Sequence, residues 1–175
     1  LLQAMQEILQ NCPEAHIKVA GISVLGVNGI KSRIKIPAYG KYLRRLILKN
    51  RLEGKVRVLG NLSAEEMKRE YLSAQIFVCP SAVENSPNSV AEGQLLGVPV
   101  AASRTGGIPD IVKDGVSGML FEKGNVHELA ACVSRILTDK QLAKELSASE
   151  RETAAKLYNG ENNYQKLIEI YQSIE

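Results

Sequence analysis

The chain has 175 residues, of which 45% are hydrophobic and 23% are charged. It is therefore long enough to bury a core without disulfide or metal staples, and too apolar to be a disordered segment. A net charge of +3 is too small to indicate nucleic-acid binding by itself, and no apolar run approaches the ~18–20 residues of a membrane span. The cysteines Cys12, Cys79 and Cys132 form no CxxC pair, which argues against a zinc site or a disulfide framework and predicts a reducing, cytoplasmic compartment.

The chain opens on a helical pattern without an initiator methionine. Leu2, Met5, Ile8 and Leu9 follow the spacing of one helix face, and the start lacks the basic region and long apolar core of a signal peptide. We therefore expect a piece of a longer polypeptide.

Short apolar runs then alternate with helical patterns along the chain. Strands are expected at 16–20, 55–59, 75–79, 98–102 and 118–121, and helices at 39–52, after Ser63, at 88–96, 108–113 and 126–137. Segment 23–36 is expected to be irregular. Strands that are continuously apolar are buried on both faces, which predicts an α/β fold with a doubly wound, Rossmann-like parallel sheet.

Two further helices, at 140–157 and 163–174, are expected to form a helical tail over 139–175. Because no linker or internal repeat interrupts the pattern, we expect residues 1–175 to form a single domain. A doubly wound sheet binds its ligands beyond the carboxyl ends of its strands, so the loops that follow strands are the candidates for a site.

The most informative loop follows the strand at 75–79. Ser86 and Pro87 fit the N-cap and first position of a helix. The free amides of Asn88, Ser89 and Val90 would then form an anion site suited to a diphosphate. Glu92 follows within two turns, where a carboxylate can accept hydrogen bonds from a ribose diol.

Glu84 and Glu92 are eight positions apart, a spacing that carries little information alone. With 16 glutamates in 175 residues, chance supplies such pairs, and Glu161 and Glu169 repeat the spacing in the tail. The loop, proline and glycines around Glu84 and Glu92 distinguish the first pair.

The residues around this pair resemble a known family. The runs P-S-A-V-E-N-S-P-N-S-V-A-E-G and T-G-G-I-P-D-I-V, with V-R-V-L-G-N-L-S upstream, are similar to the donor half of retaining glycosyltransferases of the two-Rossmann-domain (GT-B) fold. The resemblance is closest to family 4 (group 1), which includes sucrose synthases, mannosyltransferases and bacterial polysaccharide transferases. It is dense over 56–121.

The resemblance implies a role for each matching residue. Glu84, as the catalytic candidate, would face the donor sugar, Glu92 would bind the ribose, and the backbone at Asn88, Ser89 and Val90 would hold the diphosphate. Main chain at Gly60, Asn61 and Leu62 would line the base pocket, and Gly106 and Gly107 would allow a close loop approach.

The sequence departs from the family in two ways. Asn85 and Ser86, also candidates for donor binding, stand where the family often has glycine and an aromatic residue. Gly93 stands where the family usually has alanine.

The resemblance also implies the mechanism and the partners. The leaving diphosphate takes the acceptor proton, and catalysis is charge stabilisation and positioning; the sequence requires neither a metal nor another cofactor. The donor would be a UDP-, GDP- or ADP-sugar, for polysaccharide or lipid-linked glycan synthesis. The family's first strand and its N-terminal acceptor domain are missing from this sequence, so the chain alone is expected to be inactive.

Other functions stay open. They are a sugar-nucleotide epimerase or hydrolase of the same fold, whose acid–base residues do not stand out here, and a non-catalytic nucleotide-binding module. The basic helix with Lys41, Arg44, Arg45, Lys49 and Arg51 is either a solvated face or a surface attracted to an anionic membrane.

Overall fold

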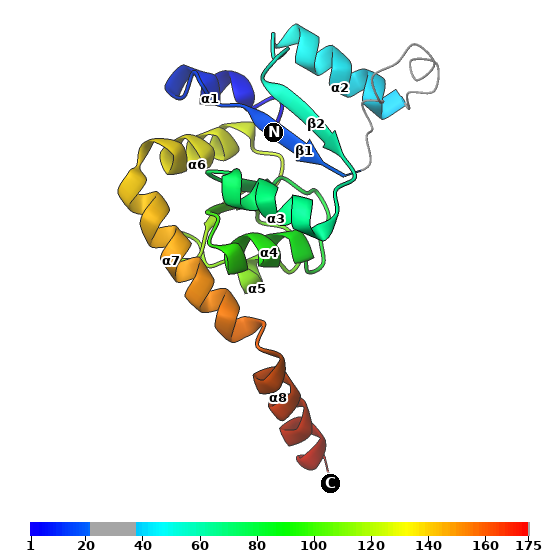
Figure 1. Ribbon diagram of the computed structural model, residues 1–175, viewed down its shortest axis with the longest axis vertical. Coiled ribbons are helices and arrows are strands. Elements are labelled where there is room, and N and C mark those ends of the chain that lie inside the picture. Colours follow the sequence, from blue (N-terminus) through cyan, green and yellow to red (C-terminus); the bar gives the residue numbers. More distant parts are fainter. Residues whose placement is uncertain (22–37, 175) are drawn as a thin grey trace. The chain divides into compact units, whose positions relative to one another are not determined.

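Eight helices and five strands alternate in residues 1–21 and 38–174, the parts of the chain that the computed structural model describes (Figure 1). The predicted irregular segment 23–36 lies outside these residues. The chain divides into two compact units, Leu1–Glu70 and Tyr71–Glu175, and each is considered by itself. None of the described helices is long and apolar enough to cross a membrane.

The first unit holds two parallel strands with helices before, between and after them. Its elements are α1 (Met5–Asn11), β1 (Ile17–Ala20), α2 (Ala38–Lys49), β2 (Val56–Gly60) and most of α3 (Ala64–Ser73). β1 pairs with β2 from Ile17 opposite Val56 to Ala20 opposite Gly60. The helix expected after Ser63 begins with a capping box, because the Ser63 amide donates to a Glu66 carboxylate oxygen at 2.8 Å and the Glu66 amide donates to the Ser63 hydroxyl at 3.3 Å.

The second unit is built on three parallel strands in the order β3-β4-β5. Its elements are β3 (Phe77–Cys79), α4 (Asn88–Leu96), β4 (Val100–Ser103), α5 (Ile108–Ile111), β5 (Met119–Phe121), α6 (Val126–Thr138), α7 (Lys140–Leu157) and α8 (Gly160–Gln172). All four residues of the central strand β4 are buried, as expected for a strand that is covered on both faces. Val90, Val100, Ile108 and Val112 form the centre of the core with no exposed surface, and each contributes about 1.5–3 kcal/mol by burial.

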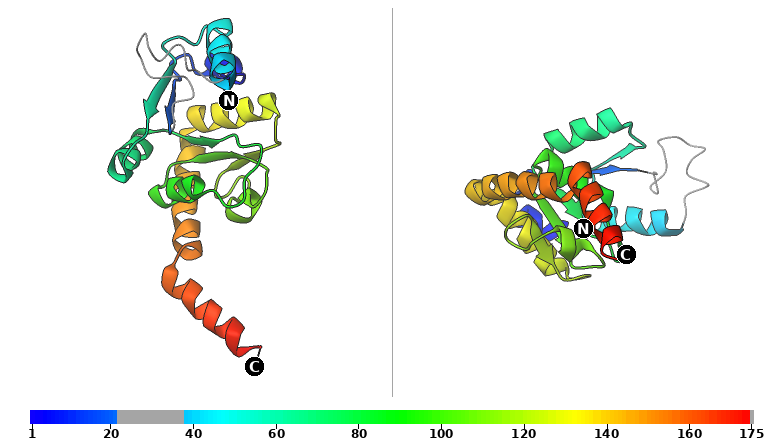
Figure 2. Two further views of the ribbon diagram at one scale, coloured as in Figure 1. Left: turned by 90° about the vertical axis from the view of Figure 1, so that its right-hand side faces the viewer. Right: turned by 90° about the horizontal axis from the view of Figure 1, so that it is seen from below.

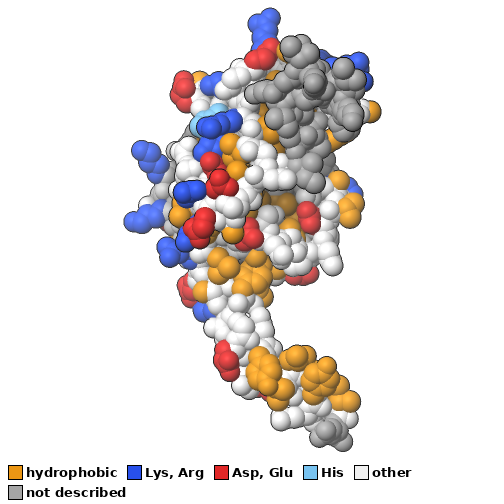
Figure 3. Space-filling view, turned by 45° about the vertical axis from the view of Figure 1, so that its right-hand side comes forward, with side chains coloured by type: hydrophobic (Ala, Val, Ile, Leu, Met, Phe, Trp, Pro, Cys, Tyr) orange, Lys and Arg blue, Asp and Glu red, His pale blue; other side chains and the backbone are white. Residues whose placement is uncertain are grey.

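The two helices of the tail differ in how they are held. α7 packs on the turn between α4 and β4, where the Ser147 hydroxyl donates to the Gly97 carbonyl at 2.7 Å and a Glu150 carboxylate oxygen accepts from the Val100 amide at 2.8 Å. α8 buries none of its residues, and Figures 1 and 2 show it continuing beyond the end of α7. Figure 3 shows apolar side chains gathered on it; they include Tyr164, Leu167, Ile170 and Tyr171, which are 48–63% exposed.

The predicted elements agree closely with the structure. All five strands lie within two residues of their expected ends, and α4 and α7 have the expected bounds. α8 begins at Gly160 rather than at 163, because the Asn159 side chain accepts from the Asn162 amide at 3.0 Å and caps the helix earlier. The parallel strands with flanking helices confirm the predicted Rossmann-like α/β class.

Candidate functional site

The candidate site lies at the carboxyl edge of the three-stranded sheet. Because β3, β4 and β5 are parallel, the loops that follow Cys79, Ser103 and Phe121 leave from this same edge. The first of these loops carries Glu84 and leads into α4, and the second carries Gly106 and Gly107 and leads into α5.

Two serines hold Glu84 in the loop after β3. The Ser81 hydroxyl donates to Oε1 of Glu84 at 2.7 Å, and the hydroxyl of buried Ser103 donates to the Ser81 carbonyl at 2.6 Å. Glu84 itself is partly exposed, so a carboxylate oxygen stays available to a ligand. Neither serine was predicted to take part in the site, although Ser81 and Glu84 have the same S-x-x-E spacing as the capping box at Ser63.

The two glycines after β4 pack directly against the backbone of the Glu84 loop. A Cβ atom on Gly106 would lie 1.7 Å from the Glu84 carbonyl oxygen, and one on Gly107 would lie 2.3 Å from the Asn85 carbonyl oxygen. The Gly107 amide donates to that Asn85 carbonyl at 2.9 Å. Gly106 also has a φ of +55°, which side chains disfavour. The two glycines therefore lie against the Glu84–Asn85 backbone, and their approach to a donor pocket stays a prediction.

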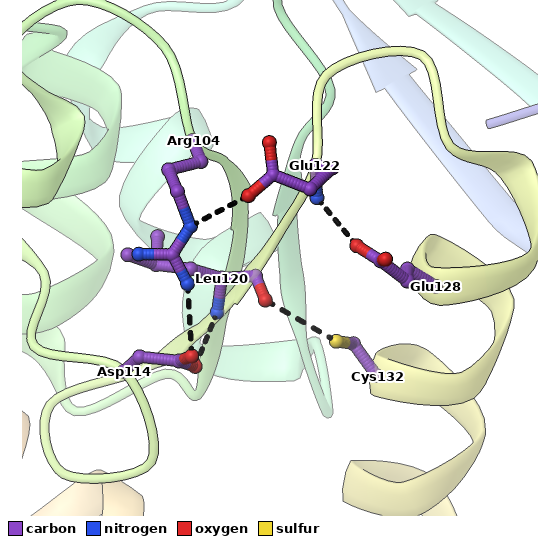
Figure 4. Close-up of polar contacts among 6 residues, drawn as sticks. All are labelled: Arg104, Asp114, Leu120, Glu122, Glu128 and Cys132. Atoms are coloured by element: carbon purple, nitrogen blue, oxygen red, sulfur yellow. Dashed lines mark hydrogen bonds and ion pairs between the residues drawn. The ribbon is translucent and has the colours of Figure 1, made fainter.

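Arg104 fixes the start of the same glycine loop (Figure 4). Its guanidinium forms ion pairs of 3.0 Å with Asp114 and with Glu122, and its amide donates to the Phe121 carbonyl at 2.8 Å. Asp114 also accepts from the Leu120 amide at 2.8 Å. Two carboxylates thus engage the positive charge of Arg104, so the pairs hold the loops after β4 and β5 together rather than leave an unopposed cation for a phosphate.

The N-cap of α4 differs by one residue from the prediction, although the helix has the expected bounds. Pro87, not Ser86, is the N-cap, and Asn88 is the first helical residue. The ψ of 113° keeps Pro87 extended and outside the helix, and its carbonyl accepts from the Val90 amide at 3.0 Å. The prediction that Ser86 caps the helix and that Val90 has a free amide was therefore wrong.

Asn88 and Ser89 supply the other two backbone amides of the predicted anion site. Neither donates a hydrogen bond within the described part of the chain, and no side chain caps α4. By contrast, the side chains of Asn125, Asp139 and Asn159 cap α6, α7 and α8. Two amides and the positive end of the helix dipole are thus left for an anion.

Glu92 lies on the exposed side of α4 and faces Tyr71 of α3. The Tyr71 hydroxyl donates to the Ser89 carbonyl at 2.9 Å, and its ring meets Phe77 edge-on with centroids 5.3 Å apart. Burial, and then the negative charge of Glu92, raise the pKa of Tyr71 well above its usual value. Tyr71 therefore holds the first turn of α4 next to Glu92.

The remaining predicted residues fall in two places. Asn85 and Ser86 are exposed in the loop between Glu84 and α4, where their side chains are accessible to a ligand. Gly60, Asn61 and Leu62 belong to the first unit, at the end of β2 and in the loop that follows it. Their contact with a base stays a prediction.

A third acidic residue, Glu150, lies elsewhere. It is fully buried and accepts from Val100 at the amino end of β4, opposite the edge that carries Glu84. Burial raises the pKa of Glu150 to about 8, and the Val100 hydrogen bond only partly opposes this shift. Its position makes Glu150 part of the packing of α7, not of the candidate site.

The chemistry available at this edge is therefore simple. Over residues 1–21 and 38–174 no three His, Cys, Asp or Glu side chains lie close enough together to hold a metal ion. The edge instead offers uncapped amides for an anion and two carboxylates, Glu84 and Glu92, that accept hydrogen bonds from hydroxyl groups.

A known family matches most of the chain. The family model described as "Glycosyl transferases group 1" matches residues 1–153. A D-inositol 3-phosphate glycosyltransferase from Nocardioides sp. is 28% identical over 178 residues, which is 98% of this chain and 38% of the relative. The chain spans between one fifth and just under half of the length of the curated relatives it matches.

Solved structures share the fold. Anabaena Alr3699/HepE in complex with UDP superposes with a TM-score of 0.82 at 23% identity, over 99% of this chain and 44% of that one. The same protein is also known in complex with UDP-glucose. The C-terminal domain of a group 1 family glycosyl transferase (LpcC) from Francisella tularensis gives a TM-score of 0.65 at 16% identity, over 87% of this chain and 92% of that domain.

Proposed function

Because the chain belongs to the group 1 glycosyltransferases, we propose that its second unit binds the nucleoside diphosphate sugar donor of a retaining glycosyl transfer. The observation that carries this proposal is the fit of Gly106 and Gly107 against the Glu84–Asn85 backbone. That fit leaves no room for side chains on the two glycines. It holds Glu84 in the loop that leads into the uncapped start of α4.

The donor is held at three points. The diphosphate accepts hydrogen bonds from the Asn88 and Ser89 amides, the ribose hydroxyls donate to Glu92, and the sugar hydroxyls meet Glu84 and the exposed Asn85 and Ser86. Charge supports this order along the donor, because carboxylates repel a diphosphate but accept from neutral hydroxyls. The UDP and UDP-glucose complexes of HepE support UDP among the UDP, GDP and ADP candidates.

Catalysis then consists of positioning and charge stabilisation. The bond between the anomeric carbon and the diphosphate oxygen breaks, the acceptor oxygen bonds to the anomeric carbon on the same face, and the leaving diphosphate takes the acceptor proton. The α4 amides stabilise the charge that develops on the diphosphate. Glu84, whose Oε1 accepts a hydrogen bond from the Ser81 hydroxyl at 2.7 Å, orients the sugar.

The acceptor would be bound by a separate domain of the same polypeptide. The matched relatives are at least twice as long as this chain, which leaves room in such proteins for an N-terminal acceptor domain. We infer an acceptor in polysaccharide or lipid-linked glycan synthesis, in keeping with relatives such as the amylovoran biosynthesis glycosyltransferase AmsK of Erwinia amylovora.

A thermal-shift series with UDP, GDP and ADP tests donor binding on this chain. At least one nucleotide is expected to raise the Tm, since a ligand at about a hundred times its Kd stabilises a protein by ~2.7 kcal/mol. Glu92→Ala should remove most of this shift through the loss of the ribose contact. Glu169→Ala, in the exposed tail helix, is the matched control and should keep the shift.

The outcomes separate the candidate functions. A shift lost in Glu92→Ala and kept in Glu169→Ala supports the donor site, and no shift with any nucleotide at millimolar concentration contradicts it. Binding together with transfer by the full-length protein excludes a non-catalytic module. Conversion of the free sugar nucleotide without an acceptor would instead indicate an epimerase or hydrolase.

A further inference from the structure

Helix α2 exposes a face that the donor site does not use. The inner side of the helix carries buried Gly40 and half-buried Leu43 and Ile47. We call the solvent-exposed remainder of the helix the α2 outer face; its exposed residues are Tyr39, Lys41, Tyr42, Arg45, Leu48 and Lys49.

The charge of this helix is of one sign. Residues 38–49 contain four lysines and arginines and no acidic residue, whereas the whole chain has a net charge of only +3. Three of these cations, Lys41, Arg45 and Lys49, lie on the outer face at four-residue intervals. Such a row of cations is complementary to an anionic surface.

Large exposed apolar side chains flank this row of cations, because at about 100° per residue Tyr39 and Tyr42 lie on one side of it and Leu48 lies on the other. Tyr39 is 62% exposed, Tyr42 48% and Leu48 61%. The two tyrosine rings stack with centroids 6.3 Å apart and so form one amphipathic platform. Tyrosine is favoured at the boundary between lipid headgroups and acyl chains, and leucine gains free energy when it enters that boundary.

We propose that the α2 outer face binds the surface of an anionic lipid bilayer, with the helix lying in the headgroup layer. The cations meet the lipid headgroups, and the tyrosine pair and Leu48 contact the headgroup layer on either side of them. Leu48 favours a bilayer over a nucleic acid, because an exposed aliphatic side chain offers neither stacking nor a hydrogen bond to bases. This inference is independent of the proposed donor site.

Co-sedimentation of the chain with vesicles tests the proposal. The chain is expected to bind vesicles of equal parts phosphatidylcholine and phosphatidylglycerol, and not vesicles of phosphatidylcholine alone. Lys41→Gln/Arg45→Gln/Lys49→Gln should weaken binding about a hundredfold, since each cation near an anionic membrane contributes about fivefold. Tyr39→Ser/Tyr42→Ser/Leu48→Ser should weaken it at least about tenfold, a loss that charge alone does not explain.

A matched triple variant controls for net charge. Lys123→Gln/Lys140→Gln/Lys144→Gln removes three exposed cations of the second unit and should bind vesicles like the parent chain. Equal loss in both charge variants, or no binding to the anionic vesicles, overturns the proposal. Binding of a single-stranded oligonucleotide in place of vesicles also overturns it, in favour of a nucleic-acid surface. Unchanged Tm and circular dichroism spectra show that the variants fold.

Discussion

Two regions of the second unit carry glutamates at the same spacing in different surroundings. In the β3–α4 region, Ser81 donates to Glu84 and Glu92 faces Tyr71, and the helix start between them has no side-chain cap. In α8, Glu161 and Glu169 are exposed on a helix that buries nothing, and Asn159 caps its start. The spacing is equal, so the surrounding residues alone make one pair a candidate site.

The difference lies in what fixes the backbone. Gly106 and Gly107 can approach the Glu84–Asn85 backbone only because they lack side chains, and a buried serine anchors that loop from β4. A carboxylate held in this way has one orientation toward a ligand, whereas an exposed helical glutamate has many. The comparison therefore predicts which substitutions matter.

The largest effect is expected from Glu84→Gln in the full-length protein. Transfer should fall about 10²–10³-fold, as when one transition-state contact is lost, while nucleotide affinity stays unchanged because Glu84 faces the sugar. Steady-state kinetics and nucleotide titration measure the two effects. Glu161→Gln is the matched control and should transfer normally; equal turnover of both variants would remove the distinction between the two glutamate pairs.

Gly106→Ala should have the next largest effect. The new Cβ would overlap the Glu84 carbonyl, and a displacement of about 1 Å at a reacting centre costs ~10²-fold in rate. Gly115→Ala is the control, because Gly115 has a comparable φ of +72° but nothing within 4 Å of its Cβ position. Both variants should lose about 1–2 kcal/mol of stability from the left-handed backbone, measured by denaturation. Only Gly106→Ala should lose transfer, and equal rates would contradict the positioning role.

Glu150 belongs to neither glutamate pair, and its burial is expected to make the stability of the chain depend on pH. Its pKa is raised to about 8 in the folded chain from 4.5, so the folded state binds more protons between these values and the free energy of unfolding falls as the pH rises. The slope should approach ~1.4 kcal/mol per pH unit in that window.

Glu150→Gln should flatten this slope, because glutamine keeps the acceptor for Val100 and does not titrate. In the control Glu152→Gln the slope should persist, since Glu152 is exposed and Lys156 lowers its pKa. Urea denaturation from pH 5 to pH 8 measures both variants. A parent slope that survives in Glu150→Gln would show that another group is responsible.

The smallest effect is expected from Gly93→Ala, next to Glu92 in α4. A Cβ there would lie 3.5 Å from Phe77 and Val100, in ordinary contact, and alanine in a helix interior is favoured over glycine by about 0.5–1 kcal/mol. The Tm should rise by a few degrees, with nucleotide binding unchanged. A lower Tm would mean that the α4–β3 packing needs the glycine.

Hydrophobic pattern and turn chemistry were enough to predict most of the fold. The apolar run at β4 and the glycine after α4, which adopts a left-handed φ of 70°, define their elements locally. The N-cap of α4 was placed one residue early, because Ser-Pro fits both N-cap-N1 and N′-N-cap and only the ψ of Pro87 decides between them.

The candidate site was predictable where it depends on residue type and not where it depends on pairing. Glu84, Glu92 and the glycine pair could be found from motifs. The links from Ser103 to Ser81 and from Tyr71 to Ser89 join residues 22 and 18 positions apart, and no local pattern predicts such contacts. Burial of Glu150 could not be predicted from the sequence either, because a single glutamate in a helix of mixed polarity is usually a surface residue.

The most direct test of the central claim is the response of backbone amide signals to UDP-glucose in ¹H–¹⁵N NMR spectra of the chain. The account predicts that the Asn88 and Ser89 amides shift with saturating ligand, together with those of Gly106 and Gly107, while the amides of Glu161 and Asn162 at the capped start of α8 stay in place. Unmoved Asn88 and Ser89 signals, in the presence of bound nucleotide, would contradict it.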